Sequence, residues 1–321
     1  MTCDPARGGQ TGCLRKGDHH EGTAGAGHVA RDDGVGIAPE DLPEVIERFF
    51  DQAAQIGSHV TLICDWHSMP RIVRIRQICN LARSHGLKVH LYLDPVALQG
   101  GRKEPSIPET AAGNSFLDPS VGKAYQATAL SLAALGPDYL GLATEVNLFT
   151  QNRVEYDALR KLIGAAYREV KARRPDLPVT VSFQWDVMTY TSAFESVSQF
   201  KGIVDVYSFT SYPDEFGNAN PKVPDNYFLR IRRLLPNARI GISELGWSSA
   251  APGSEKEQAE FLLRLPALTK DLGAEYVTLA ELHDVPIFTG DQSRLNAIGL
   301  RSVDDVPKNA WEAILTLPAI E

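Results

Sequence analysis

The chain has 321 residues, of which 43% are hydrophobic and 22% charged, which is enough apolar material for a large core and excludes disorder of the whole chain. Its formal net charge of −8, without any long Lys/Arg run, argues against binding to nucleic acid or to an anionic membrane. No stretch approaches the roughly 18 consecutive apolar residues that a membrane-spanning helix needs.

Residues 1–34 differ in composition from the rest of the chain. They hold eight of the 26 glycines and no aromatic residue, and they lack the apolar segment of a signal peptide. Residues 25–30 match the GxGxxA spelling of a dinucleotide-binding loop, but the strand and helix that must flank such a loop are not indicated. We therefore expect a flexible or non-native leader over residues 1–34, followed by a single catalytic domain over residues 35–321.

From residue 35 onward, helical patterns alternate with short apolar runs that are typical of buried strands. The first helical pattern, residues 41–56, places Val45, Phe49 and Ala53 on one face. The later helical patterns occupy residues 71–85, 119–135, 152–174, 190–200, 223–235, 255–272 and 307–317. The strand-like runs are Val60–Cys64, Val89–Leu93, Tyr139–Ala143, Val179–Phe183, Val204–Ser208, Ile240–Ser243 and Tyr276–Ala280.

This alternation predicts an α/β fold, the (β/α)8 TIM barrel. Continuous apolar strands that alternate with helices form a parallel sheet buried on both faces. Six repeats span the 216 residues from 59 to 275, or 36 residues per repeat. A weak additional strand at residues 35–38 brings the number of strands to eight, which favours a closed barrel over an open doubly wound sheet.

Polar and aromatic residues follow each of the seven clear strands, at the end where a barrel carries its chemistry. We consider them candidate substrate-binding residues: Asp65, Trp66, Asp94, Thr144, Asn147, Gln184, Trp185, Tyr212, Trp247 and His283. Three of the four tryptophans are among them, and indole faces pack well against the apolar faces of sugar rings. The set favours a glycan-binding barrel; the alternative is that the large aromatics only cap the barrel.

The same strand ends argue against other barrel chemistries. No lysine lies there, so a Schiff-base mechanism lacks its nucleophile. No HxH pair follows the first strand, and the acids and histidines are not clustered as a binuclear metal site requires. We therefore expect neither a metal nor an organic cofactor.

Glu145 and Glu244 also follow strands, and these strands stand three places apart in the predicted barrel, so the two side chains can converge. A retaining glycosidase needs two carboxyl groups about 5–5.5 Å apart, one ionised as the nucleophile and one protonated as the acid/base. Placing two carboxyl groups close together raises the pKa of one of them, which supplies the proton donor. The pair predicts retaining hydrolysis of a glycosidic bond.

Three segments resemble clan A of the glycoside hydrolases, in which the acid/base glutamate follows barrel strand 4 and the nucleophile glutamate follows strand 7. Residues 242–248 (ISELGWS) look like the nucleophile segment of family 53 endo-galactanases and family 17 β-1,3-glucanases, and residues 206–213 (VYSFTSYP) look like the strand-6 segment of family 53. Residues 299–311 resemble the chain end of many clan members.

This resemblance implies that Glu244 is the nucleophile, that Glu145 is the acid/base, and that Tyr212 orients Glu244. Thr144 departs from the pattern, because the clan usually has an asparagine there that hydrogen-bonds the sugar 2-hydroxyl.

Other functions remain open at this point. A non-catalytic glycan-binding barrel, which the departure at Thr144 favours, would bind oligosaccharide without turnover. A metal-dependent barrel hydrolase would lose its activity to a chelator. The expected partner is an oligo- or polysaccharide, and we expect a monomer. The resemblance favours an extracellular or periplasmic location, although no signal peptide is evident in the chain.

Overall fold

The computed structural model describes residues 13–19, 25–26, 42–216 and 223–317. Its centre is a sheet of seven parallel strands that neighbour one another in chain order. These strands are β3 (His59–Asp65), β4 (Lys88–Asp94), β5 (Tyr139–Gly141), β6 (Val179–Gln184), β7 (Val206–Ser211), β8 (Arg239–Leu245) and β9 (Ala274–Leu279). All seven of the clear strands predicted from the sequence are present, which confirms the parallel α/β architecture.

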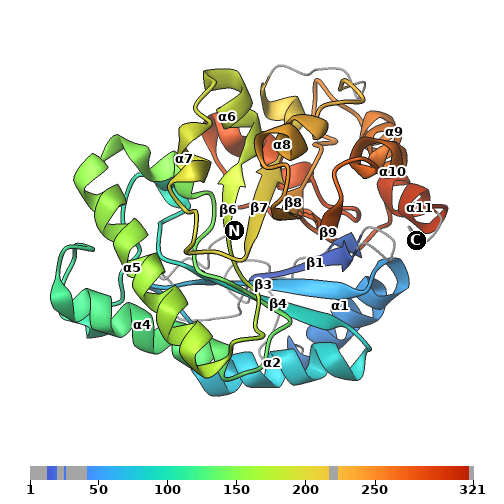
Figure 1. The fold of residues 1–321 in the computed structure, drawn as a ribbon. Coiled ribbons are helices and arrows are strands. Elements are labelled where there is room, and N and C mark those ends of the chain that lie inside the picture. The colour runs from blue at the N-terminus through green and yellow to red at the C-terminus, as the bar shows by residue number, and fades with distance from the viewer. Residues whose placement is uncertain (1–12, 20–24, 27–41, 217–222, 318–321) are drawn as a thin grey trace.

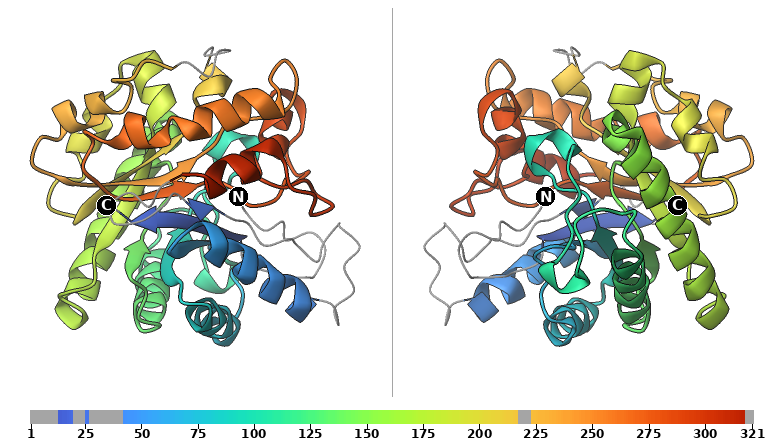
Figure 2. Two further views of the ribbon diagram at one scale, coloured as in Figure 1. Left: turned by 90° about the vertical axis from the view of Figure 1, so that its right-hand side faces the viewer. Right: turned by 90° about the vertical axis from the view of Figure 1, so that its left-hand side faces the viewer.

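Helices cover the outside of this sheet, as Figures 1 and 2 show. The longer ones are α1 (Leu42–Ile56), α2 (Ile72–Ser84), α4 (Pro119–Ala133), α5 (Arg153–Arg173) and α9 (Glu255–Leu263). The shorter ones are α3 (Gln99–Arg102), α6 (Trp185–Thr191), α7 (Glu195–Ser198), α8 (Leu229–Leu234), α10 (Leu265–Thr269) and α11 (Asn309–Leu315). The pattern at 255–272 forms two helices because Pro266 cannot donate the backbone hydrogen bond that would continue α9.

Two strands near the start of the chain complete the sheet. β1 (Cys13–His19) pairs antiparallel with both β3 and β9, and the two-residue β2 (Gly25–Ala26) pairs parallel with β9. The predicted first strand at residues 35–38 lies outside the described residues. Seven parallel strands with covering helices are therefore established, whereas the eight parallel strands of the predicted barrel are not. The division of the chain at residue 34 stays a prediction.

The sheet is buried on both faces, which explains why its strands read as continuous apolar runs. Every residue of β3, β6 and β7 is buried. Inside the sheet, a Cβ at Gly141 would lie 2.0 Å from Cδ1 of Tyr92, and a Cβ at Gly241 would lie 2.2 Å from Cζ of Tyr276. Both positions therefore require glycine, because two large tyrosine rings occupy the interior. None of the described helices is long and apolar enough to span a membrane.

Candidate active site

Glu145 lies four positions after the end of β5, in a strained backbone conformation. Its φ of 47° lies in the left-handed region, which non-glycine residues rarely adopt, and its backbone N–H donates to Ser182 Oγ at 2.9 Å. The residue is 7% exposed. Backbone strain of this kind persists only where the surroundings enforce it, and it concentrates at functional sites. The strain therefore indicates that Glu145 has a functional role in addition to packing.

Two donors hold the carboxyl group of Glu145. Thr210 Oγ1, near the end of β7, donates to Oε1 at 2.7 Å. Arg102 Nε donates to Oε2 at 2.6 Å, in an ion pair that is almost fully buried. Each carboxyl oxygen of Glu145 thus receives a hydrogen bond from a different part of the chain.

Arg102 was not among the residues predicted from the sequence. It follows Gly100 and Gly101, and all three residues have positive φ, so the loop after β4 turns sharply and carries the guanidinium to the strand ends. Its Nη1 donates to Asp94 Oδ2 at 2.7 Å. Burial by itself would lower the pKa of Arg102, but the charges of Asp94 and Glu145 raise it above its ordinary value. The arginine is therefore a fixed positive charge between two carboxyl groups.

Asp94, at the end of β4, is completely buried and links this arginine to Thr144. Thr144 Oγ1 donates to the same oxygen of Asp94, Oδ2, at 2.5 Å. The hydroxyl group that replaces the usual clan asparagine is thus directed at a protein carboxylate. Both residues, which the sequence predicted as sugar ligands, take part in the network that fixes Arg102.

Glu244 lies on β8, and its link to Glu145 runs through the ladder between β7 and β8. Its Cα partner in that ladder is Thr210, the residue that donates to Glu145. The register shifts between Phe209 and Thr210, so this pairing is local to the strand ends. Tyr212 Oη donates to Oε2 of Glu244 through a short contact. Two glutamates that are 99 positions apart in the sequence are thus joined through one threonine.

Asp186 fixes the backbone on which Tyr212 stands. The backbone N–H of Tyr212 donates to Asp186 Oδ2 at 2.6 Å, and Ser211 Oγ donates to Oδ1 at 3.0 Å. The hydroxyl group of Tyr227 also donates to Oδ1. Burial raises the pKa of Asp186, and these donors lower it in part. The carboxyl group supports the residue that contacts Glu244.

Asn147 and Gln184 support the end of β6. Asn147 uses both atoms of its amide on the backbone of Gln184: Nδ2 donates to the carbonyl group at 3.1 Å, and Oδ1 accepts from the N–H at 2.7 Å. The Gln184 side chain caps α6 by accepting from the Val187 N–H at 2.6 Å. The structure thus gives both predicted sugar ligands a role within the protein.

Asp65, at the end of β3, is likewise engaged by neighbouring residues. Ser68 donates to Oδ2 from its backbone N–H at 3.0 Å and from its hydroxyl group at 2.6 Å, and Ser106 Oγ donates to Oδ1. Burial raises the pKa of Asp65, whereas these hydrogen bonds lower it. The carboxyl group ties the loop that contains Ser106 to the strand end.

The three tryptophans predicted to stack on sugar are packed between the sheet and its helices instead. Trp66 contacts Tyr125 of α4 edge to face, with ring centroids 5.2 Å apart. Trp185 is fully buried in the hydrophobic core. Trp247 packs against Phe261 of α9 with the two rings tilted by 31° and their centroids 4.7 Å apart. The stacking role predicted for these indoles is therefore corrected to core packing.

The direction in which each side chain points is the physical reason for this correction. Successive residues of an extended chain point to opposite sides. Trp66 follows Asp65 by one position, Trp185 follows Gln184 by one, and Trp247 follows Glu244 by three. Trp66 thus points to the opposite side from Asp65, whereas Trp185 is the first residue of α6 and Trp247 lies two positions beyond the end of β8.

His283 does not join the glutamates either. Its Nε2 contacts Asp305 Oδ1 at 2.9 Å. Burial would raise the pKa of Asp305, but hydrogen bonds from His283, Arg301 and Gln52 lower it below its ordinary value. Gln52 belongs to α1, and it contacts the same carboxyl group of Asp305 as His283 does. The histidine therefore helps to attach the loop after β9 to the first helix. The contact with Asp305 gives His283 a role as a brace of this loop, and its role as a sugar ligand stays a prediction.

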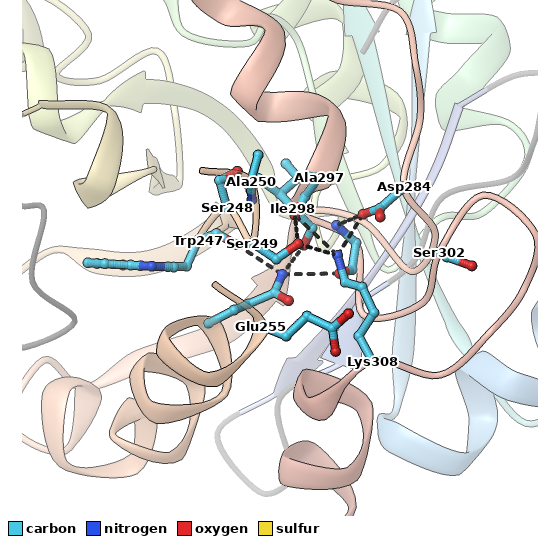
Figure 3. Close-up of polar contacts among 12 residues, drawn as sticks. Trp247, Ser248, Ser249, Ala250, Glu255, Asp284, Ala297, Ile298, Ser302 and Lys308 are labelled. Atoms are coloured by element: carbon cyan, nitrogen blue, oxygen red, sulfur yellow. Dashed lines mark hydrogen bonds and ion pairs between the residues drawn. The ribbon is translucent and has the colours of Figure 1, made fainter. Parts of the chain in front are cut away.

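A buried lysine fixes the segment that follows Glu244, as Figure 3 shows. Lys308 Nζ donates to Asp284 Oδ1 at 2.8 Å and to Ser249 Oγ at 3.0 Å. Gln258 Nε2 donates to the carbonyl oxygen of Trp247 at 2.9 Å. In Figure 3 the indole of Trp247 points away from these contacts. The loop after β8 is thus held by side chains from α9 and from the segment before α11.

The described residues contain no group of three or more His, Cys, Asp or Glu side chains that could hold a metal ion. What the strand ends do offer is a pair of glutamates, a buried arginine, and hydroxyl donors from Thr210 and Tyr212. Such a set can hold one carboxyl group ionised, as a nucleophile, and can leave a second carboxyl group able to bind and release a proton.

No family model matches the chain, and no curated protein matches its sequence. Solved structures do match it. The Ignisphaera aggregans GH53 catalytic domain is 14% identical with a TM-score of 0.62, and the match covers 89% of this chain and 88% of that one. A GH5_18 structure from Streptomyces cattleya in complex with GlcNAc is 17% identical, with a TM-score of 0.67, over 87% of this chain and 77% of that one.

An exo-β-1,4-mannosidase from Opitutaceae bacterium strain TAV5 is 16% identical, with a TM-score of 0.65. The match covers 86% of this chain but 55% of the mannosidase, so the chain spans little more than half of that protein. All three matches belong to clan A of the glycoside hydrolases. At these identities they establish the fold, and at that level they confirm the resemblance found in the sequence.

Proposed function

We propose that the protein is a retaining glycoside hydrolase that cleaves a β-linked glycan, with Glu244 as the nucleophile and Glu145 as the acid/base. The observation that carries this proposal is the link through Thr210, which is paired with Glu244 in the ladder and donates to the Glu145 carboxyl group at 2.7 Å. The fold shared with clan A glycoside hydrolases supports it.

In the first step, a carboxylate oxygen of Glu244 attacks the anomeric carbon while the glycosidic carbon–oxygen bond breaks. Tyr212 Oη, which donates to Oε2 of Glu244, keeps this carboxylate oriented. Glu145 transfers its proton to the departing oxygen, so the aglycone leaves as an alcohol. The product of this step is a glycosyl ester on Glu244.

In the second step, Glu145 is a carboxylate and accepts a proton from water. The water oxygen bonds to the anomeric carbon, and the ester bond to Glu244 breaks. Two inversions restore the original anomeric configuration, and both carboxyl groups return to their starting charge. Thr210 and Arg102 remain within reach of Glu145 and can stabilise the charge that it carries between the two steps.

The names of the matching structures suggest where a substrate screen should begin. One match is a β-1,4-mannosidase, and a Streptomyces cattleya GH5_18 variant is in complex with Manβ1-4GlcNAc. We propose β-mannosides as the first substrates to test. β-Galactans and β-1,3-glucans follow, because segments of this chain resemble families 53 and 17.

The experiment that tests the proposal is a hydrolysis screen with the wild type, Glu145→Gln and Glu244→Gln. Glu275→Gln is the matched control, because Glu275 lies at the start of β9 and pairs with Arg239, at the other end of the sheet from Glu145. We expect a loss on the order of 10⁴-fold or more for Glu244→Gln and about 10²- to 10⁴-fold for Glu145→Gln. The control should stay within a few-fold of the wild type. Full hydrolysis by both site variants would overturn the proposal.

A non-catalytic glycan-binding barrel is the second candidate function. The contact that favours it is the Arg102–Glu145 ion pair, because an arginine beside a carboxyl group favours the ionised form that has no proton to give. Oligosaccharide binding without turnover by the wild type, across the whole screen, would select this candidate over the hydrolase.

A further inference from the structure

Arg102 is the charged group in direct contact with Glu145, and the proposed mechanism does not say how it affects the proton of that residue. It is 1% exposed, and its donors are shared between Oε2 of Glu145, Oδ2 of Asp94 and the carbonyl oxygen of Val96. Both Arg102 and Glu145 adopt the left-handed backbone conformation, at φ 61° and 47°. Two strained residues are thus joined by a buried ion pair of 2.6 Å.

The two oxygens of Glu145 face donors of different kinds. A guanidinium group can only donate, so Oε2 cannot keep its contact with Arg102 and carry a proton toward it. A hydroxyl group can donate or accept, so Thr210 can rotate its O–H bond and accept a hydrogen bond from Oε1. A proton taken up from solvent by Glu145 therefore belongs on Oε1.

The charged groups around Glu145 come from several elements. Arg102 comes from the loop after β4, Asp94 from β4 itself, and Glu244 from β8, opposite Thr210. Asp94 and Glu244 each add a negative charge when ionised, which disfavours a second carboxylate beside them. Arg102 is the positive charge in direct contact, and Asp94 with Thr144 fixes its position.

We propose that Arg102 is a positioning residue that holds Oε2 of Glu145, directs the catalytic proton to Oε1, and sets the pH at which Glu145 takes up that proton. The inference rests on the proposed function for its role in catalysis, and on the contacts alone for its effect on protonation. With Arg102 in place, Glu145 gains its proton only at lower pH than it would without the arginine.

The test compares Arg102→Met with Lys103→Met, which removes the same charge from the adjacent, exposed position. In Arg102→Met the alkaline limb of the pH profile of kcat/KM should move up by about one pH unit or more, because an opposite charge within about 4–6 Å shifts a carboxyl pKa by that much. The shift should appear with an aryl glycoside whose leaving group needs a proton and disappear with a dinitrophenyl glycoside. Lys103→Met should follow the wild type.

A second measurement does not depend on turnover. Carbon-13 labelling of the glutamate carboxyl groups allows Glu145 to be titrated by NMR, with its signal assigned by its absence in Glu145→Gln. Its midpoint should rise in Arg102→Met and in Asp94→Asn/Arg102→Met, the double variant in which Asp94 does not remain as a buried carboxylate without its arginine. An unchanged midpoint in both variants overturns the inference. A wild type that hydrolyses nothing would overturn the proposed function instead, and the titration would still decide the role of Arg102.

Discussion

The two ends of the same parallel sheet differ in the kind of side chain that they bury. At the amino-terminal end, the rings of His59 and His90 stack with centroids 4.1 Å apart, and Tyr139 and Tyr276 pack against His90 at 4.4 and 4.8 Å. At the carboxyl-terminal end, the corresponding space holds buried charges, among them the Arg102–Glu145 pair. One end is filled with aromatic rings, whereas the other is filled with carboxyl groups and their donors.

A layer of hydroxyl groups lies between the two ends. Tyr92 Oη donates to Ser208 Oγ at 3.2 Å and lies 3.2 Å from Tyr276 Oη, and all three residues are buried. Under the proposed function, this arrangement separates stability from chemistry along the strands, as is common where catalytic residues follow parallel strands. Changes at the aromatic end should reduce stability and spare activity, and changes at the charged end should do the reverse.

Gly241→Ala is the strongest test of the aromatic end. The new Cβ would lie 2.2 Å from Cζ of Tyr276, whose ring is fully buried and has no room to move. We expect a loss of about 3 kcal/mol in the free energy of unfolding, at the upper end of the cost of overpacking. Urea denaturation measures it. Gly164→Ala on α5, where the nearest atom is 3.2 Å away, is the control and should change stability far less. A strong loss of kcat in folded Gly241→Ala would contradict the expectation that changes at the aromatic end spare activity.

Tyr212→Phe should produce the opposite result at the charged end. The variant removes the hydroxyl group that donates to Glu244 and keeps the ring, which packs in the core near Ile298. A hydrogen bond to a charged group contributes about 1.5–3 kcal/mol, which corresponds to about a 10- to 100-fold loss of kcat/KM. Steady-state kinetics and a thermal melt measure the two effects. Tyr190→Phe, at an exposed tyrosine of α6, should change neither. Equal losses in both variants would contradict the role of Tyr212.

The smallest expected effect is on the pH dependence of stability, and it comes from Asp214. This residue is a buried carboxyl group beside the loop after β8. It accepts from the Ser248 N–H at 3.1 Å and from Arg294 Nη2 at 3.0 Å. Burial raises the pKa of Asp214 from its ordinary value of 3.8 to about 7. Between these two values the folded state binds a proton that the unfolded state has released, so stability falls as pH rises from about 4 to about 7.

Asp214→Asn should remove this part of the pH dependence. Thermal melts at pH 5 and at pH 8 should show a smaller decrease for the variant than for the wild type, because the asparagine has no proton to lose. Glu215 also contacts Arg294, at 3.8 Å, and burial raises its pKa as well, so Glu215→Gln measures how much this neighbour adds to the same pH dependence. A decrease in Asp214→Asn as large as that of the wild type would show that Asp214 is not the group that titrates.

The repeating pattern of the chain was enough to predict most of the fold, because buried parallel strands are continuous apolar runs. The same pattern put Glu145 and Glu244 at strand ends, and the ladder pairing of Thr210 with Glu244 follows from that arrangement. The start of the chain was harder. The antiparallel strand β1 carries a polar segment (CLRKGDH) that no apolar periodicity reveals.

The errors at the strand ends have two physical causes. The indoles of Trp66, Trp185 and Trp247 were placed in the site because only their position along the chain was considered, and not the direction in which each side chain points. Arg102 was missed because its place depends on a loop conformation. The sequence signal for it was Gly100-Gly101 directly before an arginine, which permits three successive residues of positive φ.

The most direct test of the central claim is to trap the glycosyl-enzyme intermediate with a 2-deoxy-2-fluoro glycoside of the sugar that the screen identifies, and to map the adduct by mass spectrometry. Trypsin releases residues 240–256 as one peptide, which contains Glu244. We predict that fragmentation locates the sugar on Glu244, and that Glu145→Gln still forms the adduct when the leaving group is dinitrophenolate or fluoride. An adduct on any other residue, or inactivation with no covalent sugar, would contradict the account.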